Sequence, residues 1–403
     1  MVIGIIGGGA SGMAAALAAS ENPNTQVLLF ERQARLGRKL QTTGNGRCNL
    51  TNLYALDCGY HGEDAAFARF ALEAFGPEDT RSWFRAMGLF TVAEPSGRVY
   101  PYSDQANSVL DVLRFALERP NIQVLTGFEV TKVRRNGGGF TVENGEESYC
   151  CDKLIVACGG LAGTKVGGSM AGYKLLGKLG HRSTRLRPAL VQFKSGWGGV
   201  AGLKGVRANC NAKILYNGDL YAQSTGELQF TEYGLSGPVI FEVSRDACQK
   251  KGNWACRLDF LPDVGKEELM GELLRRQSTL LPVEEMLTGI LHNRLGRVLT
   301  KAAGVSGNGK IADLRSEELE AVCRVVKAFD ISLTEPMGMD CAQVTAGGIL
   351  TEEFDPATME SRLVPGLYAC GEVLDIDGDC GGYNLQWAWS SGRLAGLSAG
   401  KEA

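Results

Sequence analysis

Three glycines near the N-terminus have the spacing of a nucleotide-binding loop. Gly7, Gly9 and Gly12 match G-x-G-x-x-G, with Ala10 and Ser11 between the last two. The first glycine of such a loop permits a tight turn, the second lets the backbone approach a pyrophosphate, and the third lets a helix pack closely on a strand. We therefore predict a pyrophosphate at this loop, because free N–H groups and the helix dipole favour an anion at a helix N-terminus.

The context of the loop supports this interpretation. It follows an apolar run at 2–6 and precedes an Ala-rich stretch at 11–20, and a second apolar run covers 27–30. This order predicts a right-handed β-α-β unit with two buried parallel strands. Glu31 follows the second run, where an acceptor for ribose hydroxyls is expected and where a carboxylate disfavours a 2′-phosphate.

A second glycine-rich region near the C-terminus indicates which dinucleotide binds. The run 366–372 is strand-like and ends in Gly371-Glu372, as in flavoproteins whose acidic residue meets the ribitol or phosphate part of FAD. Gly381, Gly382, Tyr383 and Asn384 then open a helix whose N-terminus is expected to face the flavin, where it would stabilise negative charge on the reduced ring. A dehydrogenase that uses only NAD has no need of this second cluster, so we predict FAD.

The remaining pattern predicts an α/β protein with an inserted domain. The run 153–157 reads as a third buried strand, and 122–149 as an antiparallel hairpin or small meander around a glycine turn at 136–139. Glycine-punctuated strands cover 188–264 and helical periodicity covers 265–337. We expect a discontinuous Rossmann-like FAD-binding domain of the glutathione-reductase type at 1–187 and 338–403. It is interrupted by a β-barrel-like insert on the substrate side at 188–264 and a helical part at 265–337.

Longer motifs make the chain resemble a known family. They are the stretch 36–52 with Thr-Gly-Asn-Gly-Arg-Cys-Asn at 43–49, Gly-Leu-Ser-Gly-Pro at 234–238, Gln-Val-Thr-Ala-Gly-Gly at 343–348, and 371–396. Together they resemble the BaiN/RdsA-like FAD-dependent oxidoreductases, also called the aminoacetone oxidase family. The resemblance implies a FAD domain with a barrel-like insert, and a 37–49 loop lying along the flavin. The predicted cofactor-binding set is Gly7, Gly9, Ala10, Ser11, Gly12, Glu31, Arg32, Gly37, Lys39, Thr43, Gly44, Asn45, Val130, Ala157, Gly159, Gly371, Glu372, Asp377, Gly381, Gly382, Tyr383, Asn384 and Leu385.

Four residues are candidates for the chemistry. Glu232 and Tyr233 precede the Gly-Leu-Ser-Gly-Pro turn, and Tyr233 could donate a proton to carbon, although an ordinary barrel turn explains the pair equally well. Arg47 could offset an anion. Cys48 stands where disulfide reductases carry a redox pair, but no partner follows at short spacing, so a packed thiol beside the flavin is the better interpretation. Some members of the family carry His in the segment before this turn, where this chain has Phe230, Thr231, Glu232 and Tyr233.

The source and destination of the electrons stay open. No second G-x-G-x-x-G follows another strand, so no dedicated NAD(P)H domain is expected, and NAD(P)H is expected to dock transiently. The favoured activity is reduction of a conjugated C=C in a carbonyl compound of the steroid or bile-acid 3-oxo-Δ4 type, as the family implies. The alternatives are oxygen-dependent oxidation of a small amino ketone such as aminoacetone, an RNA-modifying flavoprotein, or a flavin redox sensor.

Composition limits the partners and the surroundings. A net charge of −3 and the absence of a long basic run argue against nucleic acid. No apolar run is long enough to span a membrane, and the pattern of the first residues predicts no signal peptide. The 12 Cys form no CxxC pair and stand beside only 3 His, so no metal site and a reducing, cytoplasmic setting are expected. The partner expected is a small-molecule substrate, and the sequence does not indicate an oligomeric state.

Overall fold

A computed structural model describes residues 1–401 and divides the chain into two compact units. Unit 1 comprises Met1–Pro188 and Ala342–Ala403, and unit 2 comprises Ala189–Cys341. Each unit has a hydrophobic cluster of its own, so each can be described by itself.

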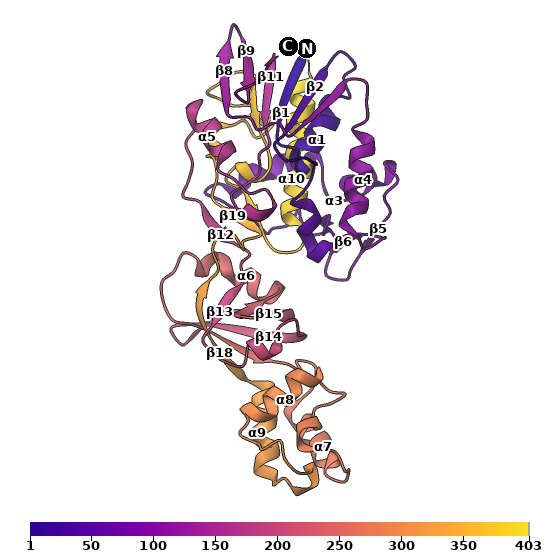
Figure 1. The fold of residues 1–403 in the computed structure, drawn as a ribbon, viewed down its shortest axis with the longest axis vertical. Coiled ribbons are helices and arrows are strands. Elements are labelled where there is room, and N and C mark those ends of the chain that lie inside the picture. Colours follow the sequence, from indigo (N-terminus) through magenta and orange to yellow (C-terminus); the bar gives the residue numbers. More distant parts are fainter. Residues whose placement is uncertain (402–403) are drawn as a thin grey trace. The chain divides into compact units, whose positions relative to one another are not determined.

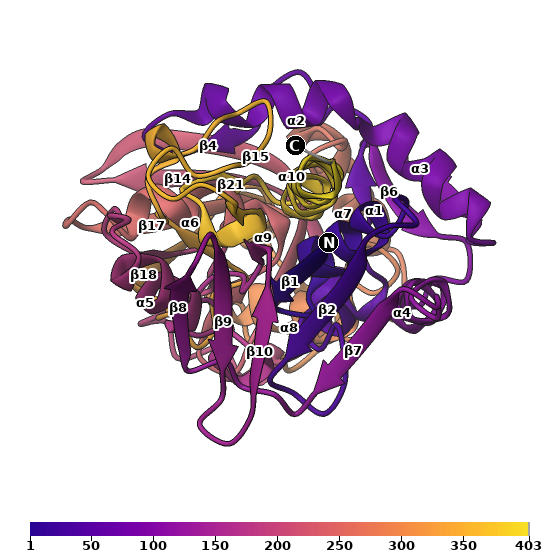
Figure 2. The ribbon, with the colours of Figure 1, turned by 90° about the horizontal axis from the view of Figure 1, so that it is seen from above.

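Unit 1 is built on a five-stranded parallel sheet with the strand order β20-β11-β1-β2-β7. Apolar residues fill the central strands because both faces of the sheet are covered. The α1 and α10 helices pack together on one face, and the β8, β9 and β10 strands cover the other (Figures 1 and 2). The strands are β1 (Val2–Ile6), β2 (Gln26–Glu31), β7 (Ile122–Thr126), β8 (Lys132–Asn136), β9 (Gly139–Glu143), β10 (Ser148–Cys151), β11 (Lys153–Val156) and β20 (Leu367–Ala369).

Short elements complete unit 1. The paired strands are β3 (Thr51–Asn52), β6 (Arg98–Pro101) and β5 (Thr91–Ala93), β4 (Tyr60–His61) with β21 (Asp377–Gly378), and β12 (Arg187–Ala189) with β19 (Val344–Ala346). The helices are α1 (Ala10–Ala19), α2 (Ala68–Ala74), α3 (Pro77–Ala86), α4 (Ala106–Ala116), α5 (Ala171–Lys178) and α10 (Tyr383–Gly400).

Two small-residue stripes allow α1 and α10 to approach closely. A Cβ atom on Gly392 would lie 2.3 Å from the Ser11 carbonyl oxygen, and one on Gly396 would lie 2.3 Å from that of Ala15. All of α1 except Ala10 is buried. Small residues at these contacts let the backbones of α1 and α10 come close together, so the Ala-rich segment forms a buried central helix.

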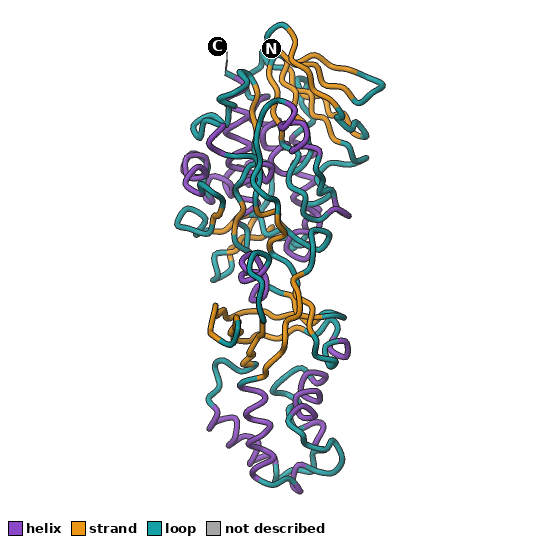
Figure 3. Tube along the Cα trace, turned by 90° about the vertical axis from the view of Figure 1, so that its left-hand side faces the viewer, coloured by secondary structure: helices purple, strands orange, loops and turns teal. Residues whose placement is uncertain are grey.

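Unit 2 contains a closed six-stranded barrel with the order β13-β16-β15-β14-β17-β18. Its strands are β13 (Phe193–Ser195), β14 (Arg207–Tyr216), β15 (Asp219–Phe230), β16 (Gly234–Ser236), β17 (Trp254–Asp259) and β18 (Phe329–Pro336). Its helices are α6 (Pro238–Ala247), α7 (Lys266–Arg276), α8 (Asn293–Ala302) and α9 (Ser316–Lys327). The barrel strands and the helices contribute residues to one hydrophobic core. Figure 3 shows the strands of this unit in orange and its helices in purple.

Two segments differ from their expected roles. Ile122–Thr126 is not part of an antiparallel meander but pairs in parallel with β2, so only β8 to β10 form the meander. The helical part of the insert ends at Lys327, and Phe329–Pro336 returns as a barrel strand paired with β17 and β13. Both errors concern long-range pairing, because a short alternating run does not specify its partner strand.

No helix of the described residues is long and apolar enough to cross a membrane. Within the same range, no group of three or more His, Cys, Asp or Glu side chains is arranged to hold a metal ion.

Candidate active site

Four chain segments meet at the carboxyl edge of the parallel sheet. In register, Ile6 lies beside both Phe30 and Val156, and Val156 lies beside Ala369. The residues that follow these strands therefore emerge in a row. They include the predicted residues Gly7, Glu31, Ala157, Gly159, Gly371 and Glu372. Open α/β sheets bind ligands at this edge. The binding crevice lies where the strand order reverses, so that the connections after two neighbouring strands run to opposite sides.

The loop at Gly7 to Gly12 is shaped by close backbone approaches. Gly7 has φ +111° and donates its N–H to the Phe30 carbonyl oxygen at 2.8 Å. A Cβ on Gly7 would lie 2.4 Å from the Ala157 oxygen, and one on Gly12 would lie 1.8 Å from the Gly7 oxygen. Only glycine fits at either position, because a side chain would collide with backbone.

The start of α1 is open toward a ligand. Gly9 precedes the helix, no side chain caps it, and its first turn holds no acidic residue. A Cβ on Gly9 would have no atom within 4 Å. The first N–H groups of a helix have no partners within the helix, so this end can hold a phosphate.

The Glu31 carboxylate holds the glycine loop by accepting backbone hydrogen bonds. One carboxylate oxygen accepts the Gly8 N–H at 2.8 Å, and the other accepts the Gln33 N–H at 2.7 Å. Each oxygen retains acceptor capacity, so these bonds still allow contact with ribose hydroxyls. Arg32 instead donates to the Gly167 carbonyl oxygen at 2.8 Å, which ties β2 to a neighbouring loop.

Lys39 and Glu372 form an ion pair at this edge. Lys39 Nζ lies 2.7 Å from one Glu372 oxygen, and the Thr345 N–H donates to the other at 2.8 Å. Gly371 has φ +75°, and its missing Cβ leaves room for the Ser11 side chain. Residues that are distant in sequence thus hold one carboxylate in place beside the start of α1.

The start of α10 also lacks a side-chain cap, but it is more crowded than the start of α1. Gly382, the residue before the helix, has φ +107°, and a Cβ there would lie 2.3 Å from the Thr51 carbonyl oxygen. No side chain caps α10, and its first turn contains no acid. Asn384 closes the preceding loop by accepting the Gly378 N–H at 2.8 Å and donating to the Gly378 oxygen at 2.6 Å.

A buried polar network fixes the position of α10. Gln386 accepts the hydroxyls of Thr51 at 2.5 Å and Thr80 at 3.0 Å, and it donates to the Phe75 carbonyl oxygen at 2.9 Å. Trp387 donates to the Gly371 oxygen, and Trp389 donates to the Leu50 oxygen. The sequence pattern alone did not single out Gln386, because its partners come from three separate segments.

The 37–49 loop has an unusual backbone. Gly44, Asn45, Gly46 and Cys48 all have positive φ. Cys48 is fully buried, and burial raises the pKa of its thiol to about 12. This thiol stays protonated near neutral pH, which argues against the nucleophilic or redox role for which it was a candidate and fits a packed thiol.

Arg47 is engaged within the same region. Its guanidinium lies 3.4 Å from Glu94 and 3.4 Å from Asp104, and it stacks 3.9 Å above the Tyr100 ring centroid. Its charge is therefore partly offset by carboxylates, so it is a weaker candidate for binding an anionic substrate than the sequence suggested.

The other predicted cofactor residues of unit 1 differ in their surroundings. Three of them donate hydrogen bonds to carbonyl oxygens: the Gly37 N–H to Gly8, the Thr43 hydroxyl to Leu40, and the Ala157 N–H to Ile6. Gly159 and Gly381 have positive φ, whereas Val130 and Asp377 are buried. Tyr383 packs edge-on against Tyr60, with 5.8 Å between ring centroids, and Leu385 is half-buried against the core.

Glu232 and Tyr233 lie between β15 and β16 of unit 2. Glu232 is paired with Lys204 at 2.7 Å, and this hydrogen-bonded contact lowers the pKa of its carboxyl. Tyr233 donates its hydroxyl to Gln192 at 2.6 Å, and partial burial raises its pKa. Near neutral pH, the tyrosine holds a proton that the glutamate lacks.

Two residues near α10 were missed. His61 has no motif of its own, but β4 pairs with β21, and its Nε2 lies 2.7 Å from Asp379. Asn49 ends the Thr-Gly-Asn-Gly-Arg-Cys-Asn motif, and its buried Oδ1 has no hydrogen-bond partner. The motif at 43–49 could have drawn attention to Asn49. Nothing in the sequence places His61 near α10, because that position depends on the pairing of β4 with β21.

These features fit FAD. An open helix start with a glycine loop suits a pyrophosphate, and the uncapped start of α10, which has no acidic residue in its first turn, suits negative charge on the flavin ring. Lys39, Glu372 and the α1 loop would hold the pyrophosphate and ribose region, while the start of α10 would hold the ring.

Comparison with known proteins agrees with this assignment. The HI0933-like protein Rossmann domain matches residues 1–398. The chain is 39% identical over 404 residues to a 3-dehydro-bile acid delta(4,6)-reductase of Clostridium scindens, covering 98% of each protein. It is 32% identical over 390 residues to a ribosomal RNA dihydrouridine synthase of Escherichia coli, covering 96% of this chain and 95% of that protein.

A solved structure shares the fold. The 3-ketosteroid delta1-dehydrogenase from Sterolibacterium denitrificans superposes with a TM-score of 0.53 at 12% identity, covering 99% of each chain. Fold and site together define a Rossmann-type, FAD-binding oxidoreductase. The chain belongs to the HI0933-like Rossmann family, which confirms the resemblance inferred from its motifs.

Proposed function

We propose that this protein reduces a C=C bond conjugated with a carbonyl group in a steroid- or bile-acid-like 3-oxo compound, with NAD(P)H as the electron donor. The observation that carries the proposal is the 39% identity to a bile-acid delta(4,6)-reductase across 98% of both proteins. Bound FAD supplies hydride transfer between donor and substrate.

The charge of unit 2 favours a small substrate. Residues 189–341 contain 18 Lys and Arg against 19 Asp and Glu. Strong phosphate binding depends on accumulated positive charge, which this balance does not supply across the unit as a whole.

Of the two candidate residues before the Gly-Leu-Ser-Gly-Pro turn, Tyr233 is the one suited to donate a proton. Reduction of a conjugated carbonyl compound adds a hydride at the β-carbon and a proton at the α-carbon. The pKa of Tyr233 is raised by burial, so its hydroxyl is protonated, whereas the lowered pKa of Glu232 leaves that carboxyl ionised. A general acid must carry its proton at the working pH.

Substitution separates these roles. We expect Tyr233→Phe to lower the rate of substrate reduction roughly 100-fold, the size typical of losing a general acid. Glu232→Gln, the neighbouring control, should change it little. Both variants should be reduced by NAD(P)H at the wild-type rate, as measured by anaerobic stopped-flow absorbance. Equal losses in both variants would contradict a specific role for the hydroxyl.

The activity itself is tested with the flavin as the reporter. The holoprotein is reduced anaerobically with NADH or NADPH and then mixed with a 3-oxo-Δ4 steroid or bile acid. Return of the oxidised flavin spectrum, together with a product heavier by two hydrogens, supports the proposal. Flavin bleaching by aminoacetone with release of peroxide would favour amino ketone oxidation instead.

Ribosomal RNA is a second candidate substrate. Relatives at 32% and 28% identity are named ribosomal RNA dihydrouridine synthases. The uracil ring also has a C=C conjugated with a carbonyl, so the same chemistry would serve. Formation of dihydrouridine in ribosomal RNA, without turnover of any steroid, would replace the proposed substrate and leave the reaction class unchanged.

A further inference from the structure

Tyr233 lies on a rigid turn of the barrel. The Thr231 N–H donates to the Gly234 carbonyl oxygen at 2.8 Å, and the Gly234 N–H donates back to the Thr231 hydroxyl at 3.0 Å. The Tyr233 carbonyl oxygen accepts the Ser195 N–H from β13 at 2.9 Å. The backbone that carries the phenol is therefore fixed, while the Tyr233 side chain is 40% exposed and open to water.

Gln192 is the hydrogen-bond partner of this phenol. The Tyr233 hydroxyl donates to Gln192 Oε1 at 2.6 Å, and this is its only hydrogen bond among the residues that the structure describes. The Val191 N–H donates to Ser244 Oγ at 3.0 Å, and the Gln192 carbonyl oxygen accepts the Met337 N–H at 2.8 Å. The backbone on this side of the contact is therefore held in place as well.

The amide nitrogen of Gln192 makes no hydrogen bond to any other described residue. A glutamine amide carries an acceptor and a donor on one planar group. The torsion that orients this group is broad and roughly twofold, so a half-turn exchanges the oxygen and the nitrogen at little cost. Gln192 can therefore accept from the Tyr233 hydroxyl or donate to the same phenol oxygen.

The charges around Tyr233 oppose its ionisation. Burial raises the pKa of the phenol most, and negative charge on Cys341 and on Glu232 raises it further. Within the described part of the chain, no other side chain forms a hydrogen bond with the phenol oxygen. Gln192 is thus the side chain in position to stabilise the phenolate that remains when the proton leaves.

The proposed reduction requires such a donor. Hydride addition at the β-carbon leaves an enolate, whose electron pair takes the Tyr233 proton at the α-carbon. The O–H bond breaks, and its electrons remain on the phenolate oxygen, which regains a proton from water afterwards. An amide that turns to donate frees the hydroxyl proton for the substrate and stabilises the charge that develops on the phenol.

We propose that Gln192 is a positioning residue for Tyr233: its amide oxygen holds the hydroxyl at rest, and its amide nitrogen donates to the phenolate as the proton leaves. The inference rests on the proposed function. It adds to that function the group that sets the acidity of the proton donor.

The first test measures the acidity of Tyr233 itself. A difluorotyrosine is placed at position 233 of the holoprotein, because fluorination brings the pKa of a phenol toward neutral pH, and fluorine NMR follows its ionisation. Gln192→Leu, which removes the amide, should raise this pKa by about 1, a tenfold change in acidity. Gln192→Glu keeps an acceptor, loses the donor and adds negative charge, so it should raise the pKa further.

The second test measures the substrate step by anaerobic stopped-flow absorbance. Gln192→Leu should slow reduction of the 3-oxo-Δ4 compound about tenfold, in line with the weaker acid, and should leave flavin reduction by NAD(P)H unchanged. The double variant Tyr233→Phe, Gln192→Leu should be no slower than Tyr233→Phe alone, because Gln192 acts only through the phenol.

Gln229 on β15 provides a matched control. It is half-buried like Gln192, and its side chain forms no hydrogen bond with the residues described. Gln229→Leu should leave both the pKa of Tyr233 and the rate of substrate reduction unchanged.

The outcomes separate the inference from the function on which it rests. An unchanged Tyr233 pKa in Gln192→Leu, or a double variant slower than Tyr233→Phe, overturns the role of Gln192 and leaves the proposed reaction intact. A holoprotein that reduces no 3-oxo-Δ4 compound overturns the proposed function, even where the fluorine signal shifts as expected. If Gln192→Leu does not fold, the comparison of wild-type protein with Gln192→Glu decides.

Discussion

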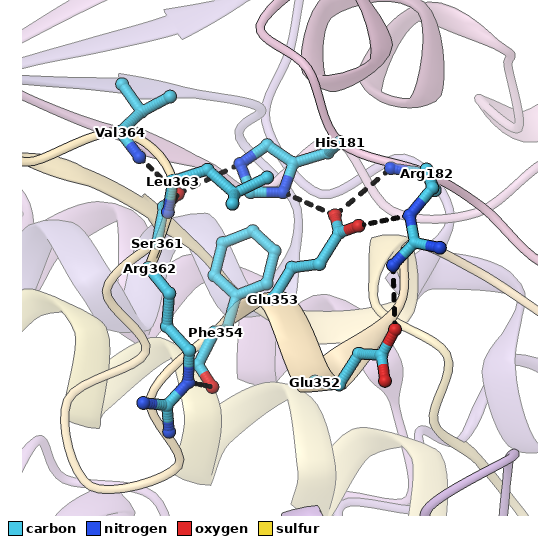
Figure 4. Close-up of polar contacts among 9 residues, drawn as sticks. All are labelled: His181, Arg182, Glu352, Glu353, Phe354, Ser361, Arg362, Leu363 and Val364. Carbon is cyan, nitrogen blue, oxygen red and sulfur yellow. Dashed lines mark hydrogen bonds and ion pairs between the residues drawn. The ribbon is translucent and has the colours of Figure 1, made fainter.

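At the scale of single residues, hydrogen bonds determine which side chains can carry charge. His181 is buried between two partners, with Nδ1 2.9 Å from Glu353 and Nε2 3.0 Å from Ser361 (Figure 4). Ser361 Oγ already accepts the N–H groups of Leu363 and Val364 at 3.1 Å and 2.9 Å. The serine hydroxyl therefore donates to Nε2, which leaves His181 neutral with its proton on Nδ1.

This arrangement predicts a loss of stability on mild acidification. Burial lowers the pKa of His181 below its ordinary value of 6.5. A group with a lowered pKa in the folded state binds protons more readily when unfolded, so its stabilising effect is present above about pH 6.5 and falls below it. We expect the Tm of the protein to fall between pH 7 and pH 5, as followed by circular dichroism.

The matched variant is His181→Gln, which removes the titrating group. Its Tm should be lower at pH 7 but should fall less between the same pH values. A parallel fall in both proteins would show that another group controls this pH range. Glu353 does not confound the comparison, because its pKa is lowered from 4.5 and its own titration lies at lower pH.

At the scale of elements, the contact between α1 and α10 depends on missing side chains. Gly392 lies against the Ser11 carbonyl oxygen, which cannot move without disturbing the nucleotide loop. We expect Gly392→Ala to destabilise the protein by about 1–3 kcal/mol through overpacking. FAD affinity should fall as well, because the strain acts on α1, the helix that follows Gly9.

Gly271 in α7 is a glycine at which a side chain would meet no obstruction, unlike Gly392. A Cβ there would meet no atom within 4 Å, and the residue is inside a helix. Gly271→Ala should therefore stabilise the protein by about 0.5–1 kcal/mol. Urea unfolding of both variants checks the pair, and a stabilised Gly392→Ala would show that the helices separate readily.

At the scale of the whole molecule, the two units have separate cores and separate proposed roles. All the residues that we assign to FAD lie in unit 1, and the chain leaves and re-enters that unit through the paired strands β12 and β19. A chain in which residues 190–341 are replaced by a short Gly-Ser linker should fold and bind FAD.

The shortened chain should lose substrate reduction, because it lacks Tyr233, the proton donor that we propose. Flavin absorbance after dialysis measures binding, and anaerobic mixing with the substrate measures reduction. A folded but colourless product that takes up no FAD would show that unit 2 is needed to hold the cofactor. Circular dichroism separates that outcome from failure to fold.

The local pattern of the sequence determined the α/β class, the Gly7 loop, the helix beginning near Gly382 and the FAD cofactor. These depend on short-range spacing and on backbone conformations that only glycine adopts readily. Tertiary structure decided what depends on distant partners. It placed Ile122–Thr126 in the parallel sheet, returned Phe329–Pro336 to the barrel, and brought His61 to Asp379.

The same distinction applies to the chemistry of the candidate site. Residue type and spacing made Cys48, Glu232 and Tyr233 candidates but left their protonation states open, because a pKa is set by burial and neighbouring charge rather than by sequence position. Complete burial of Cys48, the ion pair of Glu232 with Lys204 and the unpartnered oxygen of Asn49 all arise from contacts made only in the folded chain. The sequence thus indicated where a dinucleotide can bind, and folding decided which of the candidate side chains hold a proton, a charge or an unpartnered acceptor.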